Sequence, residues 1–180
     1  MAGSRESKEV ATTTTAKELI EFYQLQPHPE GGFYKRTYCA EGKIFTSSHQ
    51  NRFRGGGERF YSTGIYYLLV ENACSRLHRI ASDEMWHYYL GGPITIVEIF
   101  PSGGGVKQTV LGPDFRSGQV VQYVVPAGVW FGSFPNPGTS FAFVGCTVAP
   151  GFDFEDFEIA NKSMLLEQYP QATELIERLS

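Results

Sequence analysis

Between residues 33 and 148 the hydrophobic residues fall into short runs of branched and aromatic side chains, separated by glycine and proline. Runs of this length with a period of two residues are typical of β-strands, and their close spacing favours a sandwich or a barrel. The predicted strands are Phe33–Tyr38, Phe60–Val70, Ser75–Ile80, Met85–Leu90, Ile94–Phe100, Val106–Leu111, Gln119–Val125, Val129–Phe134 and Ser140–Val148. The pattern therefore predicts a mostly β fold.

The two ends of the chain follow a different pattern. Residues 1–14 are polar and threonine-rich, which predicts a disordered tail. Thr15 and Glu18 then have the spacing of a capping box, so a helix is expected to begin here and to end before Pro27. Helical spacing returns in Lys162–Gln168 and Pro170–Leu179. Residues 15–180 are thus expected to form a single domain, with one N-terminal and two C-terminal helices outside the strands.

Composition narrows the class of partner. The net charge is −4 and no run of lysine or arginine occurs, so nucleic acid is not an expected partner. No apolar segment reaches membrane-spanning length and no signal-peptide core is present, so no membrane partner is expected either. The three cysteines lack a C-x-x-C pair, which suggests thiols in a reducing compartment and predicts a cytoplasmic protein. Aromatic residues make up 14% of the chain, which predicts a ring-lined core or pocket.

Two segments have a spacing that is informative about chemistry. The first places His78, Glu84 and Gly91 in the pattern His-x-Ile-x3-Glu-x6-Gly, and the second, Pro126–Phe131, reads Pro-x-Gly-x2-Phe. Together they resemble the two motifs of the cupin superfamily, His-x-His-x3-Glu-x6-Gly and Pro-x-Gly-x2-His. The chain more narrowly resembles the type-5, uncharacterised branch of that superfamily. The segments that carry this narrower resemblance are His28–Gly32, Asp83–His87, Val125–Trp130 and Ala149–Phe157.

This resemblance implies a jelly-roll β-barrel, similar in architecture to cupin sugar-nucleotide epimerases. It does not imply a metal centre in this chain. Metal-binding cupins use three histidines and a glutamate, whereas here two of those positions hold Ile80 and Phe131. His87 would face away if Glu84 faces inward, because strand side chains alternate. Two protein ligands rarely hold a divalent ion, so neither a metal nor another cofactor is expected.

The resemblance also locates a candidate pocket around His78 and Glu84. A neutral His78 can act as a base, with Glu84 as its partner and a tyrosine as proton donor. The predicted catalytic residues are His78, Glu84 and Tyr88, and the predicted substrate-binding residues are Arg36, Tyr66, Trp86, Trp130 and Phe131. The strand period carries Trp86 and Tyr88 inward with Glu84, unless a bulge between Ser75 and His78 changes which residues of that strand face inward.

Two further segments, just before the first predicted strand and after the last one, carry expectations of their own. His28–Gly32 can be a tight turn or a place where the backbone approaches a ligand. The phenylalanines of Pro150–Glu158 are expected to pack over the barrel, with the acidic residues between them in water.

Three functions remain open at this stage. The pocket can bind a small polar or sugar-like molecule and isomerise it, bind it without catalysis, or hold a metal for an oxygenase through a nonstandard ligand. A homodimer is expected because open sheet edges and an exposed aromatic face need cover.

Overall fold

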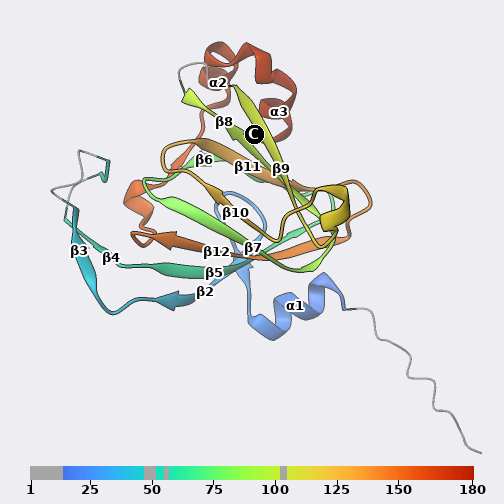
Figure 1. Ribbon diagram of the computed structural model, residues 1–180, viewed down its shortest axis with the longest axis horizontal. Helices are drawn as coiled ribbons and strands as arrows, with labels where there is room; N and C mark the ends of the chain where they lie inside the picture. Colours follow the sequence, from blue (N-terminus) through green and yellow to red (C-terminus); the bar gives the residue numbers. More distant parts are fainter. Residues whose placement is uncertain (1–13, 47–51, 55–56, 102–104) are drawn as a thin grey trace, which may run out of the picture.

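The structure is a computed structural model that describes residues 14–46, 52–54, 57–101 and 105–180. The described part of the chain is built on two antiparallel β-sheets packed face to face, with helices on their outer faces (Figure 1). The strands of the two sheets are β1 (Gln26–Pro27), β2 (Phe33–Cys39), β5 (Thr63–Val70), β6 (Ser75–Arg79), β7 (Asp83–Gly91), β8 (Ile94–Ile99), β9 (Val106–Leu111), β10 (Gln122–Val125), β11 (Trp130–Pro135), β12 (Phe141–Ala149) and β13 (Glu158–Ile159). One sheet has the order β1-β2-β5-β12-β7-β10 and the other the order β13-β6-β11-β8-β9.

A small hairpin and the helices complete the fold. The hairpin pairs β3 (Lys43–Phe45) with β4 (Glu58–Phe60). The α-helices are α1 (Ala16–Tyr23), α2 (Lys162–Gln168) and α3 (Thr173–Arg178), and short 3-10 turns are η3 (Phe115–Ser117), η4 (Phe154–Asp156) and η5 (Pro170–Ala172). The capping box at the start of α1 is confirmed, because the Thr15 side chain accepts from Glu18 N and the Glu18 carboxylate accepts from Thr15 N.

The hydrophobic core has three layers that follow from the alternation of side chains along the strands. Between the sheets lie inward-facing residues of both, such as Leu69, Ile96 and Val144. On the outer face of the six-stranded sheet, Leu68 and Phe143 cluster with Leu19 of α1. Because neighbouring strand residues point to opposite faces, one strand can supply two layers.

The outer face of the five-stranded sheet is covered by α2 and α3. Leu77 and Trp130 from the sheet pack with Leu165 and Ile176 from these helices. The predicted mostly β architecture, with one N-terminal and two C-terminal helices outside, is thereby confirmed. Apart from residue 14, the predicted tail lies outside the described residues. None of the helices in the described ranges is long and apolar enough to cross a membrane.

Candidate functional site

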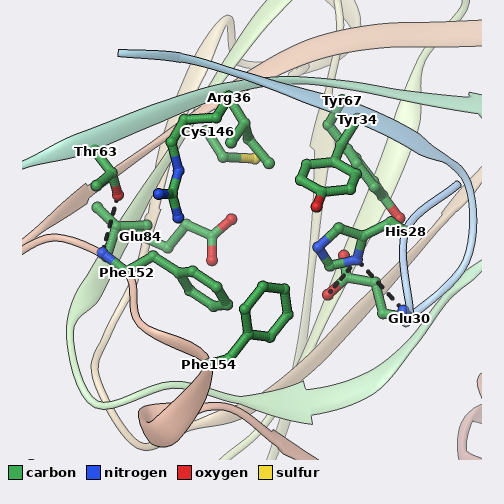
Figure 2. Close-up of a pocket in the computed structure, with 12 residues that line it drawn as sticks. His28, Glu30, Tyr34, Arg36, Thr63, Tyr67, Glu84, Cys146, Phe152 and Phe154 are labelled. Carbon is green, nitrogen blue, oxygen red and sulfur yellow. Dashed lines mark hydrogen bonds and ion pairs between the residues drawn. The ribbon is translucent and has the colours of Figure 1, made fainter. Parts of the chain in front are cut away.

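A small cavity opens on the inner face of the six-stranded sheet, between β2, β5, β12 and β7 (Figure 2). Its wall follows from strand register, because residues directly opposite one another share a face. Tyr34 lies opposite Tyr67, and Arg36 lies opposite Ile65. Val148 lies opposite both Thr63 and Glu84. The cavity volume is about 50 Å³, and the lining residues are His28, Glu30, Tyr34, Arg36, Thr63, Ile65, Tyr67, Glu84, Cys146, Val148, Phe152 and Phe154.

The segment between β1 and β2 forms a tight turn at the edge of this cavity. Gly31 and Gly32 have positive φ angles of 116° and 70°. A Cβ at Gly31 would lie 2.2 Å from the carbonyl oxygen of Cys74, so only glycine fits. The Tyr67 hydroxyl donates to the Gly31 carbonyl at 2.8 Å. The turn is thus fixed on the sheet, and it presents His28 and Glu30 to the cavity.

Glu30 is a buried carboxylate held by two side chains of β6. The Ser75 hydroxyl donates to Oε1 at 2.9 Å, and His78 Nε2 lies 3.1 Å from Oε2. Ser75 and His78 are three residues apart, so they would face opposite ways in a regular strand. A register shift between β6 and β11 lets both face inward, while Leu77 packs under the C-terminal helices. The possible bulge in this strand is therefore present. It turns the Ser75 side chain toward Glu30, while His78 still faces inward.

His78 lies behind Glu30 and uses both ring nitrogens there. Its Nδ1 lies 2.7 Å from the Arg76 carbonyl oxygen, and its Nε2 faces Glu30. The ring is only 2% exposed and packs against Phe131 at a centroid distance of 4.1 Å. In this arrangement His78 has no ring nitrogen directed at the cavity, so its contacts position Glu30.

His28, by contrast, has a ring nitrogen that points into the cavity (Figure 2). Its Nδ1 accepts from the Glu30 backbone N–H at 3.3 Å, and it lies 3.6 Å from the Glu30 carboxylate, too far for a hydrogen bond. Burial lowers the pKa of His28, partly offset by the charge of Glu30. The neutral ring with Nδ1 as acceptor carries its proton on Nε2. His28 therefore directs an N–H donor into the cavity.

Glu84 lies on the opposite side of the cavity. Its burial, together with the charge of Glu30, raises its pKa to about 8, and a hydrogen bond from Cys146 opposes the shift. Burial likewise raises the pKa of Cys146 well above the usual range. The Glu84 carboxyl is consequently protonated at neutral pH and can donate a hydrogen bond.

The rim combines a cation with aromatic rings. Figure 2 shows Arg36 on the side of Glu84, with Phe152 and Phe154 opposite the Tyr34 hydroxyl. These phenylalanines belong to an arm, residues 150–157, that the sequence correctly placed over the sheet. Asp156 in this arm is only 8% exposed and pairs with Arg59 Nε at 2.6 Å. The expectation that all acidic residues of the arm lie in water is thus wrong for Asp156, because Arg59 compensates its burial.

The structure does not bring all of the predicted site residues together. Glu84 and Arg36 line the cavity, and His78 lies directly behind Glu30. Trp86 and Phe131 are buried between the sheets, and Tyr88, which donates to the Gly91 carbonyl at 2.5 Å, packs beside them. Tyr66 lies on the outer face against Tyr23 and Phe143, and Trp130 lies under the C-terminal helices with Arg79 over its ring. The predicted catalytic role of Tyr88 and the predicted substrate-binding roles of Tyr66, Trp86, Trp130 and Phe131 stay predictions.

A metal centre does not fit this donor set. No group of three histidine, cysteine, aspartate or glutamate side chains able to hold an ion occurs within the described ranges. Ile80 and Phe131, at two motif positions, are buried in the core and have no donor atoms. The absence of a bound metal stays a prediction, which elemental analysis of the purified protein tests.

The sequence did not identify His28, Glu30 or Tyr34 as site residues. The available signal was the segment His28–Gly32, in which two titratable side chains precede two glycines. Their chemistry depends on contacts with β6, whose bulge the residue pattern alone could not settle.

Comparison with known proteins assigns the family. Residues 17–160 match the family model Cupin_5, described as "Cupin superfamily (DUF985)". The chain is 34% identical to the uncharacterized protein YML079W of Saccharomyces cerevisiae over 150 residues, which cover 79% of this chain and 74% of the yeast protein. Two solved structures each have a TM-score of 0.82 and cover 93% of this chain. They are a hypothetical protein from Leishmania major (32% identity, 99% of its chain covered) and protein SO0799 from Shewanella oneidensis (37% identity, 98% covered). The chain therefore belongs to the type-5 cupin family, as its motifs indicated.

Proposed function

We propose that this cupin-fold protein binds a small polar molecule through a compact anionic group, such as a carboxylate. The observation that carries the proposal is the set of hydrogen-bond donors around one cavity. His28 directs a neutral N–H inward, Glu84 is protonated at neutral pH, and Arg36 adds a fixed positive charge. Donors placed around a small, largely apolar space favour a ligand rich in acceptor oxygens.

Calorimetry with glycerate and its neutral amide tests this proposal. Glycerate should bind and glyceramide should not, because only the carboxylate complements the donors. His28→Ala should weaken glycerate binding on the order of 10- to 100-fold, the usual effect of losing one hydrogen bond to a charged group.

His87→Ala is the matched control, because His87 contacts Thr147 and Gln122 and does not line the cavity. It should leave the affinity unchanged. Equal binding of the acid and the amide, or equal effects of the two substitutions, would contradict the proposal.

Isomerisation or epimerisation is the second candidate, favoured by one further observation. His28 and Glu84 are two proton-carrying groups that line the same cavity, and Glu84 has a pKa of about 8. A group that titrates near the working pH is suited to proton transfer. In this scheme ionised Glu84 removes the proton from a carbon next to a carbonyl, and His28 Nε2–H gives a proton to the carbonyl oxygen. For a substrate with a hydroxyl group on that carbon, the hydroxyl then returns a proton to His28, and Glu84 delivers its proton to the former carbonyl carbon, which completes the isomerisation.

This scheme gives Glu84 the role of base that the sequence assigned to His78, and it gives His28 the role of proton donor that the sequence assigned to a tyrosine. Exchange of the C2 hydrogen of D-glyceraldehyde in D2O, followed by NMR, tests it. Wild-type protein should accelerate the exchange and Glu84→Gln should abolish it. Binding of glycerate without any accelerated exchange would leave a non-catalytic binding protein.

A further inference from the structure

The inner cavity is smaller than the small molecules it is proposed to bind. Its volume of about 50 Å³ compares with roughly 300 to 1,000 Å³ for typical small-molecule pockets. A carboxylate and a few further atoms fill it, whereas sites for whole metabolites are several times larger. The rest of a larger ligand must extend past the rim.

A groove outside the rim continues the cavity. It has a volume of about 490 Å³ and shares Tyr34, Arg36 and Phe154 with the cavity. Its other lining residues, Gln24, Gln26 and Lys35, come from the end of α1 and from β1 and β2. A ligand that leaves the cavity beside Arg36 therefore enters this groove.

The groove is positively charged. Its lining includes Lys35 and Arg36 and no carboxylate. Lys35 Nζ donates to the Gln24 side chain at 3.2 Å, which holds the ammonium group over the groove. Neither cation has a carboxylate within salt-bridge distance in the described part of the chain. Two cations without an anionic partner, beside amide donors, complement an anionic group.

We propose that this groove binds a second anionic group of the same ligand, so that the ligand is an elongated molecule with an anionic group at each end. One end is the carboxylate held in the cavity, and the other is a phosphate or a second carboxylate beside Lys35. This inference rests on the proposed function and specifies the class of ligand.

Calorimetry with acids of increasing length tests the inference. The probes are glycerate, erythronate and gluconate, each compared with its terminally phosphorylated form, and glucarate as the dicarboxylate. At the length that spans from cavity to groove, the acid with a second anionic group should bind more tightly than the matched monoanion. Lys35→Gln should reduce this gain about two- to fivefold, the effect of one exposed charge contact, and leave the monoanion affinity unchanged. A gain with glucarate as well as with the phosphorylated acids would assign either anion to the groove, and a gain with the latter alone would assign phosphate.

Lys162→Gln on α2 is the control, since it removes the same charge from a helix on the far sheet. It should leave the gain intact. Equal affinities at every length for the acids with one and with two anionic groups, or equal losses in both variants, would overturn the inference while the proposed function stands. Failure of every acid to bind would refute the proposed function and this inference together.

Discussion

Glu84→Gln should make the stability of the protein less dependent on pH, and the size of the effect follows from the burial of this carboxyl. The pKa of Glu84 is raised from 4.5 to about 8 in the folded chain. Between these values the unfolded chain releases the proton and the folded chain keeps it. The stabilising effect is thus fully present below about pH 4.5 and is lost as the pH rises through about 8.

Each pH unit in this window changes the free energy of unfolding by about 1.4 kcal/mol, so the wild type should lose up to about 5 kcal/mol across it. Glutamine has a similar shape and does not ionise. The difference in stability between Glu84→Gln and wild type should therefore increase from about pH 5 to about pH 8 and stay constant above it.

Urea unfolding followed by the fluorescence of the tryptophans measures this difference at each pH. Glu41→Gln is the control, because Glu41 is exposed and the same substitution there should give a difference independent of pH. A pH-independent difference for Glu84→Gln would refute the reasoning, since it would mean that folded and unfolded chains ionise Glu84 alike. The same titration should weaken glycerate binding above about pH 8 in wild type and not in Glu84→Gln.

Three further predictions concern the turn before β2, the buried ion pair of Asp156 and Arg59, and the oligomeric state. Gly31→Ala should destabilise the protein by about 2 kcal/mol or more in thermal unfolding, because its Cβ would meet the Cys74 carbonyl oxygen at 2.2 Å. Gly128→Ala, at another positive φ but with nothing within 4 Å, should cost less, and equal losses would contradict the steric argument. Asp156→Asn should cost on the order of 3 kcal/mol, because it removes the buried carboxylate charge that contacts Arg59 Nε at 2.6 Å, whereas Glu155→Gln, at a side chain 66% exposed, should cost little. Finally, sedimentation at tens of micromolar should show a homodimer, and a monomer alone would remove that expectation.

The strands were predictable because their signal is local. β8 and β12 are short runs rich in apolar residues between glycine and proline, a pattern that depends only on neighbouring positions, and the predicted limits agree with the structure to within a few residues. The capping box at Thr15 is equally local. The short strands β1 and β13 and the β3–β4 hairpin were missed, because two or three residues carry no periodic pattern.

The site could be predicted only where a motif fixed it. Glu84 was found through the cupin spacing, and Arg36 through its phase with Tyr34. The bulge in β6 depends on Gly132 in another strand, where a Cβ would lie 2.7 Å from the Ser75 carbonyl oxygen. Such close approach between segments far apart in sequence has no local signature. The burial of Asp156 depends in the same way on Arg59, almost a hundred residues earlier.

The raised pKa of Glu84 follows first from its burial and then from the charge of Glu30, a residue outside both cupin motifs. Two positions that hold metal ligands in metal-binding cupins are occupied here by Ile80 and Phe131, which are buried in the core and have no donor atoms. Glu30, presented by the turn before β2, instead places a negative charge near Glu84 and adds to the effect of burial on its pKa. His78 keeps its motif position but is directed at Glu30, where it fixes the charge that acts on Glu84. His78 thus influences Glu84 through Glu30. The result is a neutral acid at Glu84, where a metal-binding cupin needs an anion.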